Sequence, residues 1–222
     1  AILSRGLGDV YKRQGLASNY SLNSTVINIA QRVLNSSGSK TYDANTDALD
    51  ANITLSNLVS GETLNHSGTA TLSSANAGSY TISNLTGISI ADNAGLASNY
   101  TLTGGTHNFT VNQKAISLSG TRLYDATTDA VASDLTTISG RVGTETLTLS
   151  GTGSVADANV GVKTVSVGTL ALGDGTGLAA NYTLSGGTHQ LTINQRPLNA
   201  TLSRQYDLSL IHISEPTRQD SI

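Results

Sequence analysis

The chain repeats itself at an interval of about 82 residues, and this feature constrains its fold more than any other. GLASNY occupies residues 15–20 and 95–100, and GLAANY occupies 177–182. KTYDANTDA at 40–48 aligns with RLYDATTDA at 122–130, and RQYD follows at 204–207. A period of this length predicts a tandem array of small units rather than one domain with a single interior.

The register of the repeat divides the chain into six segments. We expect two complete units at 32–113 and 114–195, the C-terminal strands of a preceding repeat at 15–31, and the first strand of a truncated repeat at 196–207. The ends, 1–14 and 208–222, break the pattern and resemble translated sequencing-adapter read-through, so we expect both to be artefacts. The residues that recur in register, which we interpret as a structural signature, are Tyr42, Asp43, Tyr124, Asp125, Tyr206, Asp207, Asn99, Tyr100, Asn181, Tyr182, Gln113 and Gln195.

Within each unit the apolar residues alternate with polar ones. TETLTLSG and HQLTINQ are typical of strands with one buried face, and clusters such as SANAG and SGG predict turns between them. We therefore predict an all-β to mostly β fold, and leave open whether a short helical turn lies within 45–55 and 127–138. Since no Pro- or Gly-rich linker separates FTVNQ from KAISLSG, the junction between units is expected to be stiff.

The stretch KTYDANTDA…NAG…GLASNYTL…FTVNQ and its second copy resemble the YDG repeat, a mostly-beta-grasp type module of filamentous-haemagglutinin-like bacterial surface exoproteins. The resemblance covers nearly all of 15–207. It implies small grasp-like β modules arranged end to end in an elongated stalk. Ala44 and Ala126 stand where the family motif has glycine, so the turn there is expected to differ. A parallel β-helix is the alternative fold, although it predicts a period near twenty residues.

Composition excludes several classes of function. The chain has 12 Lys or Arg and 15 Asp or Glu, a net charge of −3, which gives no electrostatic footprint for nucleic acid. It has no cysteine, which excludes disulfides, thiolate metal sites and thiol nucleophiles. No apolar run approaches eighteen residues, so no membrane-spanning helix is expected.

The candidate chemical groups have simpler structural interpretations. Asp43, Asn45, Asp47 and Asp50 alternate as calcium ligands can, but the second copy lacks this pattern, and turn capping is the better interpretation. His107 and His189 each follow GGT in different units and do not form one metal site. With aromatic residues at 4%, the carboxylates lack a platform for a sugar ring. We predict no catalytic, cofactor or metal site.

The sequence argues against two covalent modifications, an isopeptide crosslink and N-glycosylation. Lys40 becomes Arg122 in the second copy and Arg204 in the third, which argues against an isopeptide crosslink that the array would depend on. Asn-x-Ser/Thr sequons recur at Asn99 and Asn181, but the adjacent tyrosines favour a role in turn and core.

We therefore predict a non-catalytic structural stalk or adhesive repeat segment of a large secreted or surface-exposed bacterial adhesin. The expected location, which the family resemblance implies, is the cell surface, associated with the outer membrane of a Gram-negative bacterium. Its partners are expected to be neighbouring repeats of the same chain. The alternative is a module that binds a host glycan or a protein receptor through the turns at GGTH or YDA.

Overall fold

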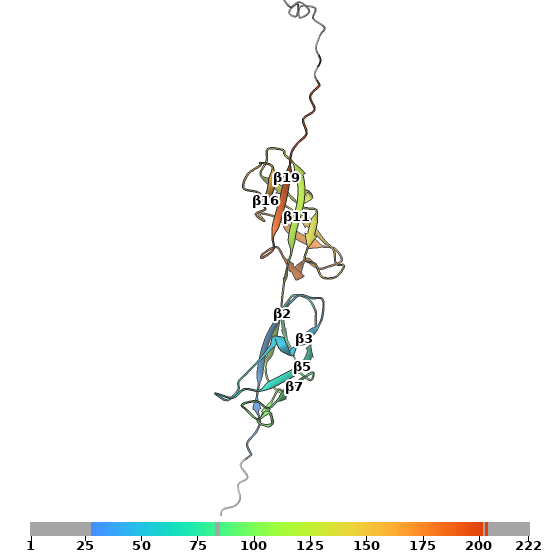
Figure 1. Cartoon of the computed structure of the whole chain (residues 1–222). Helices are drawn as coiled ribbons and strands as arrows, with labels where there is room; N and C mark the ends of the chain where they lie inside the picture. The colour runs from blue at the N-terminus through green and yellow to red at the C-terminus, as the bar shows by residue number, and fades with distance from the viewer. Residues whose placement is uncertain (1–27, 83–84, 202, 204–222) are drawn as a thin grey trace, which may run out of the picture. The chain divides into compact units, whose positions relative to one another are not determined.

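The structure is a computed structural model that describes residues 28–82, 85–201 and 203 (Figure 1). It divides between Asn112 and Gln113 into unit 1 and unit 2, and each is described by itself. The segments 1–14 and 208–222 lie outside the described residues, as do Tyr206 and Asp207.

Short strands account for the regular structure of both units. Unit 1 contains β1 (Arg32–Val33), β2 (Asn35–Thr41), β3 (Asp47–Leu49), β4 (Ile53–Ser56), β5 (Asn65–Thr71), β6 (Gly78–Thr81), β7 (Ile88–Ala91), β8 (Tyr100–Thr101) and β9 (His107–Asn112). Unit 2 contains β10 (Lys114–Ala115), β11 (Ser117–Leu123), β12 (Asp129–Val131), β13 (Thr137–Ser139), β14 (Leu147–Ser150), β15 (Thr152–Ser154), β16 (Gly161–Thr164), β17 (Ala171–Asp174), β18 (Tyr182–Thr183) and β19 (His189–Asn194).

The main sheet of each unit is mixed and has four strands. Its order is β4-β2-β9-β6 in unit 1 and β13-β11-β19-β16 in unit 2. The two central strands are parallel, and each outer strand is antiparallel to its neighbour. The first long strand of a unit therefore lies beside its last one, although some seventy residues separate them in the chain.

Smaller ladders complete each unit. β1 pairs with β8, and β10 with β18, both in parallel. In unit 1, β5 lies between β3 and β7, and in unit 2 the corresponding pairs are β12–β15 and β14–β17. These antiparallel ladders differ from the coils of a parallel β-helix, so the all-β fold of small strands in several sheets is the correct one of the two expectations.

Alternation along the strands builds the core. In β9 and β19 every second residue is buried, including Phe109, Val111, Leu191 and Ile193. This is the period-two pattern that a strand with one covered face requires. The residue that follows β1 or β10 is also fully buried, Leu34 in unit 1 and Ile116 in unit 2.

The helical turns are of the 3-10 type and three residues long. Asp50–Asn52 (η2) and Ala132–Asp134 (η4) lie within the ranges where a short turn was expected. Ala97–Asn99 (η3) and Ala179–Asn181 (η5) were not predicted. In the described part of the chain, no helix combines the length and apolar character that crossing a membrane requires.

Candidate functional site

The repeated hexapeptide forms a tight corner at the same place in both units. Its glycine is followed by η3 or η5 and then by the tyrosine that begins β8 or β18. A Cβ at Gly95 would lie 2.7 Å from Glu62 Oε2, and one at Gly177 would lie 2.5 Å from Glu145 Oε2. Glycine therefore lets the glutamate side chain lie close to the backbone of the corner, and a larger residue would require that side chain to move.

The tyrosine of the corner is buried and fully hydrogen-bonded. The Tyr100 hydroxyl donates to Glu62 Oε2 and accepts from the Val59 N–H at 3.1 Å. In unit 2, the Tyr182 hydroxyl donates to Glu145 Oε2 and accepts from the Val142 N–H at 3.0 Å. The phenol thus connects the corner to the loop that carries the glutamate.

These contacts raise the pKa of both phenols. For Tyr100 the main cause is the hydrogen bond to the Glu62 carboxylate, which favours the protonated phenol. For Tyr182 burial raises the pKa most, followed by the hydrogen bond to Glu145. Both tyrosines therefore act as neutral hydrogen-bond donors, a structural role, rather than as bases or nucleophiles.

The glutamine at the start of each unit is tied to the same corner. Gln31 Nε2 donates to the Ser98 carbonyl oxygen at 3.0 Å, and Gln113 Nε2 donates to the Ala180 carbonyl oxygen at 3.0 Å. Gln195 instead lies at a surface hollow of about 720 Å³ beside Tyr124 and Leu198.

The asparagine before the corner tyrosine differs between the units. Asn99 is exposed, whereas Asn181 is only 1% exposed. The core role expected for these two asparagines therefore holds for Asn181 alone. The sequon at Asn181 offers no accessible amide for a glycan.

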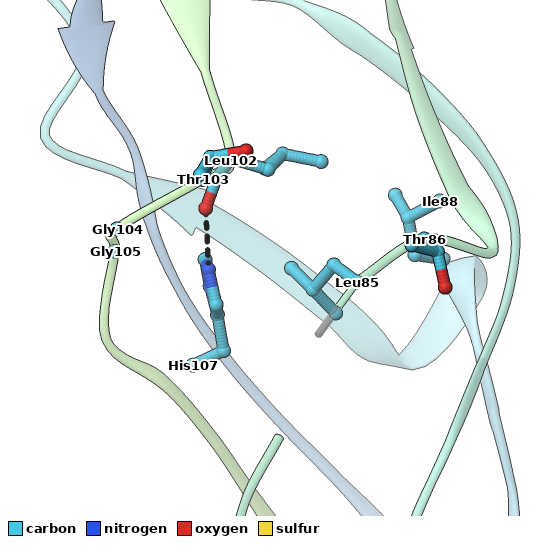
Figure 2. A pocket seen from close by; sticks show the side chains of 8 residues that line it. All are labelled: Leu85, Thr86, Ile88, Leu102, Thr103, Gly104, Gly105 and His107. Carbon is cyan, nitrogen blue, oxygen red and sulfur yellow. Dashed lines mark hydrogen bonds between the residues drawn. The ribbon is translucent and has the colours of Figure 1, made fainter. Parts of the chain in front are cut away.

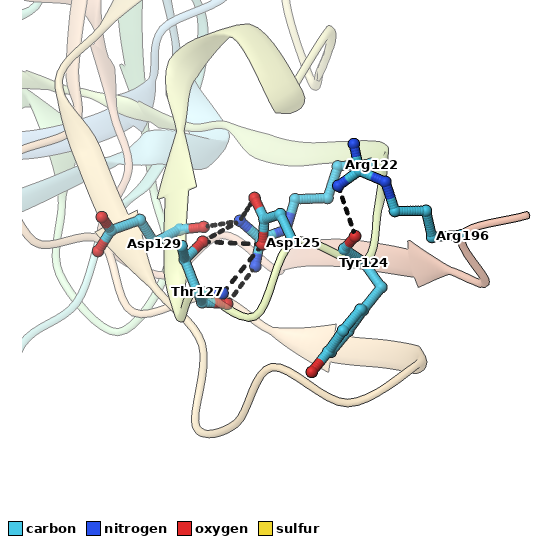
Figure 3. A network of polar contacts seen from close by, with 6 residues as sticks. All are labelled: Arg122, Tyr124, Asp125, Thr127, Asp129 and Arg196. Carbon is cyan, nitrogen blue, oxygen red and sulfur yellow. Dashed lines mark hydrogen bonds and ion pairs between the residues drawn. The ribbon is translucent and has the colours of Figure 1, made fainter. Parts of the chain in front are cut away.

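The turn after β11 is organised around one guanidinium group (Figure 3). Arg122 Nη1 donates to Asp125 Oδ2 at 3.2 Å and to the Asp129 carbonyl oxygen at 2.6 Å. Its Nη2 donates to the Thr127 carbonyl oxygen at 2.6 Å. Asp125 Oδ1 accepts from the Thr127 N–H at 3.0 Å, which closes an Asx turn.

Unit 1 builds the same turn with a lysine. Lys40 Nζ contacts Asp43 Oδ1 at 2.9 Å and donates to the carbonyl oxygens of Asn45 at 2.6 Å and Asp47 at 2.9 Å. Lysine and arginine are interchangeable here because the cation mainly satisfies carbonyl oxygens of the turn. Arg196 Nη1 also reaches the carbonyl oxygen of Tyr124, at 3.4 Å.

The aspartates of these turns are acceptors held in the ionised form. Burial acts to raise the pKa of Asp43, but hydrogen bonds from Lys40 and the Asn45 N–H outweigh it, and the pKa is lowered. Hydrogen bonds from the Thr127 N–H and hydroxyl lower the pKa of Asp125. In the described residues, no group of three or more His, Asp or Glu side chains could hold a metal ion.

The GGTH turn of unit 1 borders a hollow of about 660 Å³ (Figure 2). His107 is buried, and its Nε2 lies 2.9 Å from the Leu102 carbonyl oxygen, toward which it points. Nε2 therefore carries the hydrogen, and Nδ1 accepts from the Ser36 hydroxyl at 3.0 Å. In unit 2, His189 Nε2 donates to the Leu184 carbonyl oxygen at 2.9 Å, while Leu118 replaces the serine. Its buried Nδ1 has no hydrogen-bond partner in the described part of the chain.

Comparison with protein families gives one match. A family model described as the YDG domain matches residues 30–108 and 106–190. The chain belongs to the YDG domain family. No curated protein matches the chain, and no solved structure matches it either.

The naming motif of the YDG domain contains the most strained backbone of each turn. Ala44 has φ 62° and Ala126 has φ 67°, a left-handed conformation that glycine adopts without cost. The turn therefore places alanine in a conformation that is better suited to glycine. The motif tyrosines differ in exposure, with Tyr42 at 5% and Tyr124 at 40%. Their N–H groups donate alike, to the carbonyl oxygens of Asn112 and Asn194 at 2.9 Å.

The glutamates of the YDG units were missed by reasoning from the sequence. Glu62 and Glu145 are the acceptors for the corner tyrosines. A signal was present, because the tripeptide ETL recurs at 62–64 and 145–147, one residue out of register with the stretches that repeat at 82.

Proposed function

We propose that this chain is a non-catalytic spacer, a stalk or adhesive repeat segment of a large secreted or surface-exposed bacterial adhesin of the filamentous-haemagglutinin type. The proposed location is the outer surface of a Gram-negative cell. The observation that carries the proposal is that most of the polar residues repeated in register are engaged in holding each unit together. Tyr100 and Tyr182, Gln31 and Gln113, and the Lys40 and Arg122 cations all bind groups of their own unit.

The connection between the units supports a spacing role. β9 ends at Asn112 and β10 begins at Lys114, so one residue, Gln113, joins the two units along the chain. Its side chain is hydrogen-bonded within unit 2. In an array with such short connections, the number of units would determine the end-to-end length of the array.

The second candidate is a module that binds a glycan or a protein receptor. The hollow beside the GGTH turn, lined by Leu85, Leu102 and Gly104 among others, favours it. Ligand sites in proteins commonly have volumes of roughly 300–1,000 Å³.

The two candidates are separated by testing the chain for receptor binding. Immobilised chain would be presented with a glycan array and with host cells, and Thr86→Arg, at an exposed residue that lines the hollow, would serve as the variant of the hollow. Specific, saturable binding that this variant abolishes would refute the spacer proposal, whereas the absence of such binding supports it. Protease shaving of intact bacteria that express the parent protein would test the surface location.

A further inference from the structure

Each unit places the strand by which the chain enters beside the strand by which it leaves. β2 and β9 are parallel over six residue pairs, from Ser36↔His107 to Thr41↔Asn112. β11 and β19 are parallel over six pairs, from Leu118↔His189 to Leu123↔Asn194. Tension on the chain therefore pulls the start of one strand and the end of its parallel neighbour in opposite directions, along their common axis.

We propose that this pair of strands, the terminal-strand clamp, makes each unit a tension-bearing element. The inference rests on the proposed function, since a tethering segment is loaded through its ends. Force along the strand axis displaces one strand lengthwise against its neighbour, so all six residue pairs of the ladder are loaded at the same time. When an antiparallel pair is pulled apart from one end, its bonds break one after another.

The packing of the clamp prevents it from yielding by gradual sliding. β4 and β6 flank it in unit 1, and β13 and β16 flank it in unit 2, so its ladder lies inside the sheet. Its side chains Phe109, Val111, Leu191 and Ile193 are at most 2% exposed. A slip by one residue would turn every such side chain to the opposite face of the sheet, so the ladder must break as a whole.

The chain is also secured where it enters the clamp. β1 and β10, which precede the clamp strands, form parallel ladders of their own with β8 and β18. Gln31 and Gln113 are hydrogen-bonded to the corners that lead into those strands. Tension from the preceding chain therefore reaches the clamp only after these contacts have been loaded.

Force spectroscopy on single molecules of the full chain tests the inference by changing the direction of loading. The chain has no cysteine, so cysteine handles are site-specific. Handles added at the two termini load the clamps in shear. Handles at Val160→Cys and Gln195→Cys flank the antiparallel pair Gly161↔Ile193 and peel β16 from β19. Circular dichroism would first establish that the handled proteins are folded.

We expect the rupture force in end-to-end loading to exceed that in peeling, because six residue pairs resist together in the first geometry and one pair at a time in the second. Each unit should rupture in one step that releases about 280 Å of chain, less its folded length. Ile193→Val, inside the clamp, should lower the end-to-end force, whereas Ala171→Gly, in β17, should leave it unchanged.

Equal forces in the two directions, or gradual lengthening without steps, would overturn the clamp while leaving the spacer proposal intact. Saturable receptor binding would do the reverse, because it contradicts the spacer without affecting a measured rupture force.

Discussion

Replacing Ala126 by glycine should stabilise the protein, although a small-to-smaller change at a surface usually does nothing or weakens it. Ala126 has φ 67° and is exposed, so its methyl group adds conformational strain without being buried. The left-handed conformation costs a residue other than glycine roughly 1–2 kcal/mol. Glycine increases the entropy of the unfolded chain, which costs about 0.4–1 kcal/mol. The net expectation is a gain of about 0.8 kcal/mol.

The gain should be visible in the thermal unfolding of the full chain by differential scanning calorimetry. For a domain of this size, a gain of that magnitude corresponds to about 3–6 °C in Tm. Ala44→Gly should raise the Tm of unit 1 in the same way, because Ala44 has φ 62°. The matched control is Ala171→Gly in β17, where φ is negative and glycine should cost about 0.5–1 kcal/mol. A fall in Tm for both Ala126→Gly and Ala171→Gly would refute the assignment of strain to the YDG turn.

Three further predictions concern the corner and the turns that support it. Tyr182→Phe should destabilise unit 2 by about 1–3 kcal/mol in urea unfolding, because the Val142 N–H and the Glu145 carboxylate lose their hydrogen bonds to the hydroxyl. Tyr80→Phe should cost less, because the Tyr80 hydroxyl makes its hydrogen bond to Asn76 at the surface. The raised pKa of Tyr100 contributes stability that is present below pH 10.0 and is lost as the pH rises through the higher pKa of the folded state. The midpoint of urea unfolding should therefore fall as the pH is raised above 10.0, and it should fall less steeply in Glu62→Gln. The same dependence of the midpoint on pH in both proteins would contradict the pairing of Tyr100 with Glu62. Gly187→Ala should abolish the unfolding transition of unit 2, because its Cβ would lie 1.8 Å from the Ile116 carbonyl oxygen. Gly186→Ala meets only Ala115 Cβ at 4.0 Å, so it should keep the transition and lose only about 1–2 kcal/mol of stability, because φ there is 79°.

The alternation of apolar and polar residues made the β fold predictable, because alternation and turn residues are local signals. The 3-10 turns of the corner, η3 and η5, were not predicted. The pairing of first and last strands was not predictable, since β2 and β9 carry no sequence code for which neighbour each takes. The sequence predicts a changed turn at Ala44, where the family motif has glycine, and φ there is 62°, in the left-handed region. Lys40 donates hydrogen bonds to the carbonyl oxygens of Asn45 and Asp47, which hold the turn around Ala44.

The site was predicted in part and for identifiable reasons. Tyr100, Tyr182 and Gln113 were singled out because they recur, and the structure places each of them at the corner of its unit, a location that the sequence did not predict. Asn99 and Asn181 have the same neighbours in sequence but opposite exposure, which no local pattern distinguishes. Lys40 and Arg122 hydrogen-bond the equivalent carbonyl oxygens, those of Asp47 and Asp129. The exchange of lysine for arginine therefore shows that the turn accepts either cation, and it does not show that this position lacks a structural role.

The central position of the last strand limits how a gene for such an array can change. The family match to the first unit ends at residue 108, whereas β9 continues to Asn112. A recombination event that cut within these residues would remove the middle of a sheet, not an expendable edge. Copy number should therefore vary in whole units, with breakpoints confined to the residue or two around Gln113, and lengths between two multiples of the repeat should be rare.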